Sequence, residues 1–401
     1  MQGSYRRRGL HVLFGLVLLV PRAPAANLPV FRPNDPLTRS GLDHFYNMDY
    51  DRAITDLERV AGDAAPKSQD PFALNNLADC YLVRELYRMG ALDPADYLDD
   101  RFIGPPKRPA AAAARKKIAD ILESATAIEE DRLRGKPDDV DMLYARGATR
   151  ALQSSYSGLI ERSWFTALRA AMAARRDHQR VLQLSPAFTD ANLIVGTHDY
   201  VMASLPWALK TAAAVVGFRG NRERGIEELR TAVNGAGQTS IDAKILLALF
   251  LRRDGHIDDA LGLVRDLLHQ FPGNAIFAMQ EGDILRAAHR NEEALAAYLR
   301  VWEAGRAGAF PLGGYEIAAI RMGDLQRSRQ ENAEALASYN LLEDARQAQP
   351  ELRQRALASA GQIYDSQGKS EAAVEKYRAV VAIEGSNEWT ELARRRLRGS
   401  T

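Results

Sequence analysis

The chain has 401 residues, 46% of them hydrophobic and 26% charged, which are the proportions of a folded globular protein and exclude a disordered chain. Its 53 lysines and arginines balance 52 aspartates and glutamates, so the chain lacks both the overall basic charge typical of nucleic-acid binding and an acidic excess. The single cysteine, Cys80, excludes a disulfide within the chain and a cysteine zinc site.

Residues 1–25 have the three parts of a secretory signal. Residues 6–8 are arginines, residues 10–20 are apolar, and residues 21–25 end in the small side chains that a signal peptidase recognises. We expect cleavage after Ala25, which predicts an exported protein, periplasmic or extracellular. The apolar stretch is short for a bilayer whose apolar core is about 30 Å thick. The alternative is that the segment is retained as an anchor, and only in that case is a membrane a partner.

Helical segments are expected over residues 26–104. Residues 34–66 fit one degenerate helix-pair repeat, and residues 71–90 carry leucines at helical spacing. Cys80 stands in the second stretch, where a buried apolar side chain is expected rather than a nucleophile. A linker rich in proline and alanine over residues 105–117 then leads to irregular helical repeats over residues 118–240.

The C-terminal region, residues 241–401, contains four repeats and a final helix. The repeats start at Ile241, Ala275, Glu316 and Gln354, and similar residues recur at equivalent positions within them. Position 8 is small, position 20 is always alanine, and position 24 is aromatic or branched. The residues in these three columns are Ala248, Gly282, Gly323 and Gly361; Ala260, Ala294, Ala335 and Ala373; and Val264, Tyr298, Tyr339 and Tyr377.

These columns predict two antiparallel helices in each repeat. A small residue at position 8 allows close approach, and we expect the alanine at position 20 to lie against it while position 24 packs on the next repeat. Over residues 241–387 the pattern resembles the tetratricopeptide repeat (TPR) superfamily, although no repeat has the usual tryptophan at position 4. The resemblance implies an all-α, right-handed superhelical solenoid of antiparallel helix pairs, irregular in the N-terminal half.

The stretch 196–225 is more distinctive than a generic repeat. It reads Gly-Thr-His-Asp-Tyr at 196–200 and Ser-Leu-Pro-Trp at 204–207, and it is rich in glycine and arginine at 217–225. Over about residues 138–300 it resembles a TPR subfamily that includes eukaryotic outer-membrane inclusion-clearance proteins, and it is similar to exported bacterial TPR proteins. The resemblance implies a non-catalytic, partner-binding protein. Two roles for the stretch remain open: helix ends and turns alone, or a pocket lined by His198, Asp199, Tyr200, Trp207, Phe218 and Arg219.

Motifs for catalysis are missing from the sequence. There is no HExxH or GxSxG pattern, and no two histidines stand three or four residues apart, as a helix-borne zinc site requires. Carboxylate pairs such as Asp258 and Asp259 are typical of a solvated helix face. We therefore expect a protein that is not an enzyme and that uses no cofactor and no metal.

A helical solenoid offers a long concave surface built from the first helix of each repeat. We therefore predict a scaffold that binds a protein or peptide partner in this groove and does not bind nucleic acid. The alternative is a binding protein for a small or lipidic ligand in the cell envelope, held where the irregular half meets the repeats. By repeat register the groove contains Ile245, Leu249, Arg252, Met279, Asp283, Arg286, Ile320, Asp324 and Arg327.

Overall fold

The computed structural model of the chain describes residues 35–62, 69–94, 97, 104, 106, 108–204, 220–235, 237–343, 345 and 348–399. This part of the chain is helical, and no strand occurs in it. No helix within it is long and apolar enough to cross a membrane. The predicted signal segment, residues 1–25, lies outside the described residues.

Helices follow one another along the chain with short connections. The N-terminal half contains α1 (Pro36–Tyr46), α2 (Tyr50–Ala61), α3 (Pro71–Met89), α5 (Ala112–Gly135), α6 (Val140–Ser155), the π-helical turn η3 (Tyr156–Ile160), α7 (Trp164–Leu184), the 3-10 turn η4 (Thr189–Ala191), α8 (Asn192–Ser204) and α10 (Arg222–Asn234). The C-terminal half contains α11 (Ser240–Arg253), α12 (Ile257–Gln270), α13 (Ala275–Ala287), α14 (Asn291–Arg306), α15 (Ile317–Ser328), α16 (Asn332–Asn340), α17 (Pro350–Ser366), α18 (Ser370–Ala382) and α19 (Glu388–Gly399).

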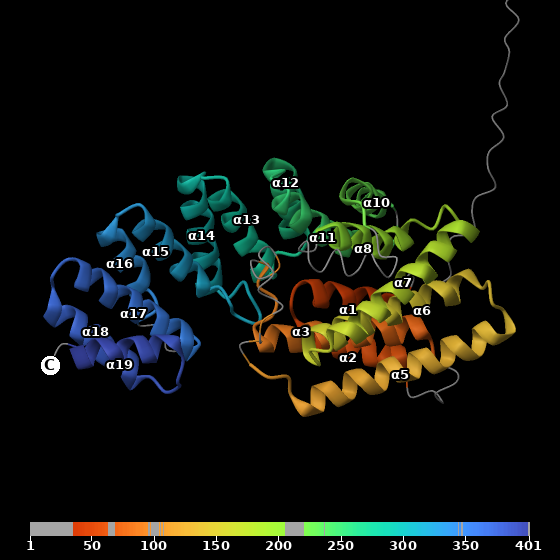
Figure 1. The fold of residues 1–401 in the computed structure, drawn as a ribbon, viewed down its shortest axis with the longest axis horizontal. Coiled ribbons are helices and arrows are strands. Elements are labelled where there is room, and N and C mark those ends of the chain that lie inside the picture. The colour runs from red at the N-terminus through yellow and green to blue at the C-terminus, as the bar shows by residue number, and fades with distance from the viewer. Residues whose placement is uncertain are drawn as a thin grey trace, which may run out of the picture.

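The helices form a TPR-like solenoid in which each helix packs on its neighbours in the chain. Helices α8 to α19 make an arch, and helices α1 to α6 gather beneath one side of it (Figure 1). The four predicted repeats correspond to the pairs α11–α12, α13–α14, α15–α16 and α17–α18. The N-terminal half also consists of helix pairs, and its α5 begins at Ala112, within the stretch predicted as a linker.

Several helices begin where the sequence supplies a side chain that caps them. The carboxylates of Asp35 and Asp70 accept hydrogen bonds from the backbone N–H of Thr38 at 2.6 Å and of Phe72 at 3.1 Å, and each is followed by proline. Asn274 caps α13 in the same way. Such caps satisfy N–H groups that a helix leaves unpaired. The start of α13 is therefore determined locally, which fixes the register of the repeat that follows.

In the last three repeats, the glycine at position 8 lies against the tyrosine at position 24 of the same repeat. A Cβ on Gly282 would lie 2.4 Å from Cε1 of Tyr298, and Gly323 is equally close to Tyr339. The tyrosine ring therefore occupies the space that we had expected the alanine at position 20 to fill. The Tyr298 hydroxyl then donates a hydrogen bond of 2.6 Å to Asp283, beside the glycine.

The first helix pair is joined directly to the repeats, although some 200 residues separate them in the sequence. The Tyr46 hydroxyl donates to Asp242 at 2.9 Å, and Nδ2 of Asn274 donates to the main-chain oxygen of Tyr46 at 2.7 Å. The rings of Tyr46 and Phe271 also pack, with centroids 5.0 Å apart. These contacts hold α1 against the junction of α11, α12 and α13.

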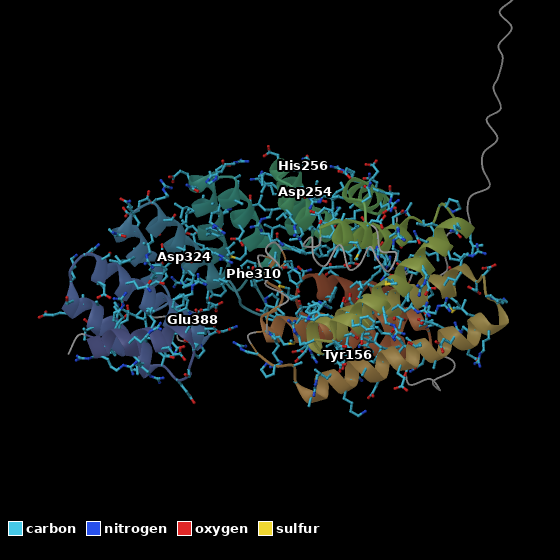
Figure 2. The ribbon with its side chains drawn as sticks, viewed as in Figure 1. Tyr156, Asp254, His256, Phe310, Asp324 and Glu388 are labelled. Carbon is cyan, nitrogen blue, oxygen red and sulfur yellow. The ribbon has the colours of Figure 1, made fainter. Side chains whose placement is uncertain are left out.

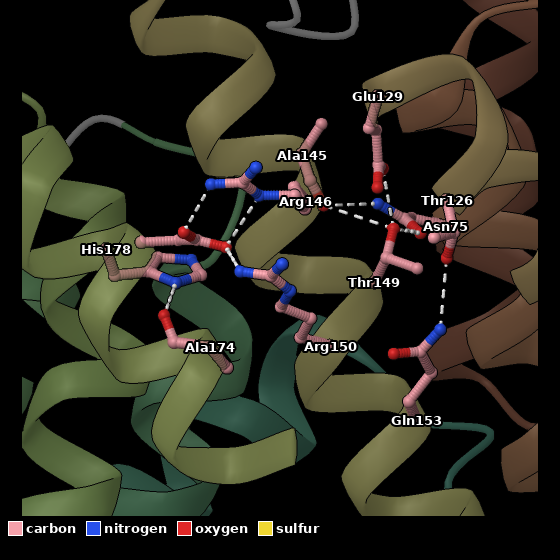
Figure 3. A network of polar contacts seen from close by, with 11 residues as sticks. Asn75, Thr126, Glu129, Ala145, Arg146, Thr149, Arg150, Gln153, Ala174 and His178 are labelled. Atoms are coloured by element: carbon pink, nitrogen blue, oxygen red, sulfur yellow. Dashed lines mark hydrogen bonds and ion pairs between the residues drawn. The ribbon is translucent and has the colours of Figure 1, made fainter. Parts of the chain in front are cut away.

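A buried polar network connects α3, α5 and α6 in the N-terminal half (Figure 3). Thr149 Oγ1 lies 2.7 Å from Asn75 Oδ1 and 2.6 Å from Glu129 Oε1, while Asn75 donates to the main-chain oxygen of Ala145. Glu129 is fully buried, and burial raises its pKa to about 8 despite the opposing hydrogen bond from Thr149. The Glu129 carboxyl is therefore protonated at neutral pH in the folded chain.

A second part of the same network joins α6 to α7. The buried carboxylate of Asp177 accepts hydrogen bonds from Arg146 at 2.7 Å and from Arg150 at 2.5 Å. His178 is also buried, with Nδ1 2.9 Å from the main-chain oxygen of Ala174 (Figure 3). Burial lowers the pKa of His178 to about 4, so its ring is neutral in the folded chain at neutral pH.

The pKa of Glu129 predicts that the chain loses stability as the pH rises above neutrality. The folded state binds this proton more tightly than the unfolded state, where the pKa is near 4.5, so the stabilisation is complete below that pH and disappears as the pH rises through about 8. His178 acts in the opposite direction, but only below pH 6.5. We expect Glu129 alone to lower the free energy of unfolding by about 1–2 kcal/mol between pH 6.5 and 8.5.

Urea denaturation followed by circular dichroism at pH 6.5, 7.5 and 8.5 measures this dependence. The Glu129→Gln variant cannot release the proton, so its stability should vary less with pH, whatever its stability at pH 6.5. Asp79 and Glu228, whose pKa values burial raises to about 7, also lose protons in this pH range. The free energy of unfolding of the variant therefore still falls with pH, but by less than that of the parent. An equal pH dependence in the parent and the variant would contradict the assignment to Glu129.

Candidate partner-binding site

A cavity of about 410 Å³, here called the inner cavity, lies between the first helices of the last three repeats and the chain at the end of α3. Its walls come from α13, α15, α17 and the start of α19, where Glu388 is labelled in Figure 2. Apolar and charged side chains are mixed along them. The lining includes Tyr87, Leu92, Asp93, Arg108, Ile276, Met279, Gln280, Asp283, Ile317, Arg321, Glu351, Leu352, Arg355, Glu388 and Trp389.

The lining residues of the repeats occupy one face of each first helix. Ile276, Ile317 and Arg355 stand at position 2 of their repeats, and Gln280 and Arg321 stand at position 6. Positions 2, 6 and 9 are four and three residues apart, which is the spacing of one helix face. The solenoid therefore presents corresponding positions of successive repeats to the same space.

Asp283 is held by two side-chain contacts at this surface. Its side chain accepts the Tyr298 hydroxyl at 2.6 Å, and Arg321 Nε lies 3.5 Å from Oδ1. Arg321 also donates through Nη2 to Asp93 at 3.2 Å, across the cavity from the repeats. Burial opposes the charge of Arg321, but Asp283 and Asp93 outweigh it and raise the pKa of the guanidinium. This arginine therefore links the array to the end of α3 while remaining charged.

Arg252 lies next to Asp283 but has few acceptors of its own. Its side chain is 8% exposed, and its Nη2 donates to the main-chain oxygen of Asp283 at 3.4 Å. Its Nε and Nη1 atoms have no hydrogen-bond partner. Burial lowers the pKa of Arg252, an effect that Asp283 partly offsets. A guanidinium has five N–H donors, so three of them are unsatisfied here.

A second charged group stands further along α15. Asp324 accepts the Tyr339 hydroxyl at 2.7 Å and Arg355 Nη2 at 2.5 Å. The Arg355 guanidinium lies over the ring of Trp389, 5.7 Å from its centroid. Trp389 is half-buried and lines the cavity, so it offers a partner an apolar face whose position Arg355 and Asp324 help to fix.

The residues predicted for the groove fall into four groups in the structure. Met279 and Asp283 line the cavity, and Arg252 is buried beside them. Arg286 and Arg327 are exposed, and Arg327 donates to Gln362. Ile320 is fully buried, so it is not part of an accessible surface. The remaining predicted residues are partly buried and lie outside the cavity lining: Ile245, Leu249 and Asp324.

The prediction omitted Arg321, Gln280, Trp389 and the wall formed by residues 87–94. Arg321 and Gln280 could have been included, because position 6 is one helical turn before position 9 on the same face. The wall at residues 87–94 belongs to a part of the chain about 190 residues before α13, and no local pattern connects the two.

The described residues of the alternative pocket lie within the packing between α7, α8 and α10. Asp199 is fully buried and pairs with Arg175 at 2.8 Å and with Arg224, and His198 Nδ1 lies 3.5 Å away. Tyr200 stacks on a neighbouring ring from α11. Trp207, Phe218 and Arg219 lie outside the described residues.

The glycines of the stretch 196–225 bring its helices together. A Cβ on Gly196 would lie 2.8 Å from the main-chain oxygen of Gly225, and a Cβ on Gly220 would lie 2.3 Å from that of Asp199. Only residues without side chains permit such contact. This packing accounts for the three glycines without a ligand.

Within the described residues, no group of three or more histidine, cysteine, aspartate or glutamate side chains is arranged to hold a metal ion. Cys80 is fully buried, with Sγ 3.9 Å from the main-chain oxygen of Tyr50. Burial raises the pKa of its thiol to about 12. The thiol is therefore not a reactive nucleophile at neutral pH.

Residues 187–307 match the family model of Iml2/Tetratricopeptide repeat protein 39. The match overlaps the stretch 138–300 on which the sequence resemblance rests. Comparison with curated proteins finds no match. The family match and the helix pairs together support the TPR superfamily as the structural class of the chain.

Solved structures with a similar fold include three helical repeat proteins. A human IFIT1 dimer with m7Gppp-AAAA is 15% identical over 91% of this chain and 84% of its own, with a TM-score of 0.37. Yeast Tom70 is 13% identical over 91% of this chain and 94% of its own, with a TM-score of 0.37. A tetratricopeptide repeat protein from Parabacteroides merdae is 14% identical over 91% and 97%, with a TM-score of 0.27. These identities are too low to transfer a function.

Proposed function

We propose that this protein is a non-catalytic TPR-like scaffold that binds a protein or peptide partner in the inner cavity. The observation that carries the proposal is the lining itself, in which Ile276, Ile317 and Trp389 stand beside Arg321 and Arg355. Apolar side chains give a partner area to bury, while fixed charges set its orientation. The cavity is bounded by successive helices of the array, so it suits an extended segment.

We further propose that the chain acts outside the cytoplasm, after removal of residues 1–25. The basic, apolar and small-residue segments at its N-terminus support this location. The partner is then a protein of the cell envelope or the surroundings. A small or lipidic ligand in the stretch 196–225 has less support, because Asp199 and Tyr200 are engaged in packing between helices.

Trp389→Ala is expected to reduce the amount of partner that co-purifies with the chain by about tenfold or more. A large aromatic side chain in a cavity contributes strongly to binding. The full chain, tagged at its C-terminus, is expressed in its own cells and cross-linked in the envelope, and the amount of partner that co-purifies with it is measured. N-terminal sequencing of the purified chain, expected to begin at Ala26, checks the proposed export.

Trp164→Ala provides the matched control. Trp164 begins α7 in the N-terminal half, is 37% exposed and is not part of the inner cavity. Its removal is expected to leave the retained partner unchanged, and circular dichroism establishes that both variants keep the helical signal. Equal retention by Trp389→Ala and the parent would show that the inner cavity is not the binding site.

A further inference from the structure

One side of α7 carries four residues that face solvent, here called the outer face. Phe165, Arg169, Met172 and Arg176 are four, three and four residues apart, which places them on one side of the helix. The helix packs on α6 and α8. The side opposite to the outer face is buried and consists of small or apolar residues: Ala167, Ala174 and Val181. The outer face is therefore the side that α7 leaves to solvent.

Phe165 is the most exposed large apolar side chain among the described residues. It is 74% exposed, whereas Leu299, the next in order, is 45% exposed. Trp164 stands beside it with its ring against η3, where a Cβ on Gly158 would lie 3.1 Å from Cζ3 of the tryptophan. Covering such side chains with another apolar phase releases the water around them. The start of α7 thus offers a small apolar area to a second surface.

The arginines of the outer face have no counter-charge within the described chain. Arg169 and Arg176 are exposed and form no hydrogen bond or ion pair with a described residue. By contrast, Arg175 and Arg180, which lie outside the outer face, are each paired with an aspartate. Asp177, the acidic residue of α7, is buried. The outer face is therefore positively charged at neutral pH.

The first turn of α5 adds to this charge. The Tyr156 hydroxyl in η3 lies 3.3 Å from the main-chain oxygen of Arg115, so the start of α5 adjoins the segment that leads into α7. Arg115 is exposed and is also unpaired among the residues that the structure describes. Glu161 is an acid in the same segment, 3.0 Å from the Tyr156 hydroxyl. It offsets one of three arginines, so the net charge here stays positive.

We propose that the outer face of α7 binds the surface of a membrane that contains anionic lipids. Phe165 and Met172 enter the boundary between headgroups and acyl chains, while Arg169 and Arg176 pair with lipid phosphates. Two apolar side chains bury little area, so the binding is weak and reversible and needs the charges as well. It requires no helix that crosses the membrane. It is thus distinct from retention of residues 1–25 as an anchor, and it does not depend on a partner in the inner cavity.

The pattern of the outer face favours a membrane over a nucleic acid or a protein. Proteins that bind single-stranded nucleic acid stack successive bases on aromatic rings along a basic groove, whereas the outer face has one ring. A standard protein interface buries about 800 Å² on each partner, which is more than four side chains of one helix supply. Apolar and basic side chains that share one face of a helix are typical of helices that lie at a membrane surface.

Sedimentation with lipid vesicles tests the inference. The full chain is purified from its own cells, and its binding to vesicles of phosphatidylglycerol and phosphatidylcholine is compared with its binding to phosphatidylcholine alone. We expect binding to the anionic vesicles, little binding to the neutral ones, and a loss of binding when salt is added. Phe165→Ala and the double variant Arg169→Gln, Arg176→Gln should each lower the affinity for the anionic vesicles by about fivefold or more.

The matched controls lie in the C-terminal half. Leu299→Ala removes an exposed apolar side chain from α14. The double variant Arg306→Gln, Arg378→Gln removes two exposed arginines that pair with no described residue. Both controls should bind the anionic vesicles as the parent does. Circular dichroism checks that every variant keeps the helical signal, which substitutions at exposed positions should not change.

Any one of five results would overturn the inference: no binding to anionic vesicles at millimolar lipid, equal binding to anionic and neutral vesicles, binding that the outer-face variants do not weaken, an equal loss in the controls, or tighter binding of a single-stranded oligonucleotide through the same residues. A retained signal segment that alone inserts into vesicles would give the third result. The substitutions leave the inner cavity intact, so the effect of Trp389→Ala on the natural partner tests the proposed function separately.

Discussion

Ala294→Asp is expected to lower the free energy of unfolding by about 3–5 kcal/mol, the largest loss that we predict for a single substitution. Ala294 stands at position 20 of its repeat on α14 and is fully buried. A carboxylate at this site either loses its hydration without gaining a partner or becomes protonated at a cost. The added atoms must also displace neighbouring side chains.

Ala296→Asp gives the matched comparison, because Ala296 is exposed on the same helix. We expect this variant to remain within about 1 kcal/mol of the parent, since the new carboxylate stays in water and only helix propensity changes. Chemical denaturation followed by circular dichroism measures both. Similar stabilities of the two variants would mean that α14 does not pack through this face.

Gly282→Ala should destabilise the chain by about 1–3 kcal/mol, although alanine normally favours a helix over glycine. The added Cβ would lie 2.4 Å from Cε1 of Tyr298, whose ring is fully buried. The ring cannot move freely, because its hydroxyl is bonded to Asp283. Part of the cost is therefore the displacement of a buried tyrosine that is hydrogen-bonded to Asp283, a residue of the cavity lining.

Gly262→Ala should have the opposite effect. Gly262 is also within a helix, α12, but is exposed, and a Cβ there would meet no atom within 4 Å. We expect stabilisation by about 0.5–1 kcal/mol from the reduced freedom of the unfolded chain. Thermal unfolding of both variants measures the expected loss of stability in Gly282→Ala and the expected gain in Gly262→Ala. Stabilisation by both substitutions would contradict the packing of Tyr298 on Gly282.

The helical repeats could be predicted because their signals are local. Gly282 and Tyr298 lie within one repeat, and the recurrence of such pairs identifies two helices in contact. The partner of Gly282 was nevertheless misassigned to the alanine at position 20, since the sequence does not say which residue of the second helix faces a small one. No local pattern in the sequence predicts the contact between Tyr46 and Asp242, because it joins segments 196 residues apart.

The candidate site was predictable in part. Repeat register placed Met279 and Asp283 on the surface that forms the inner cavity. The same register included Ile320, which is fully buried, whereas the next residue, Arg321 at position 6, lines the cavity. The unpartnered state of Arg252 depends on three-dimensional contacts and has no counterpart in the sequence.

The contacts of Tyr46 have a consequence for how the chain folds. In a simple repeat array each unit touches only its neighbours, so folding can begin at any unit and spread along the chain. Here Tyr46 is hydrogen-bonded to Asp242 and Asn274. The contacts between α1 and the centre of the array therefore form only after the large loop between them has closed. Adding or removing a repeat between these residues would break the contacts, because either change would move Tyr46 away from Asp242 and Asn274. The number of helices between α1 and α13 is thereby fixed by the contacts of a single tyrosine.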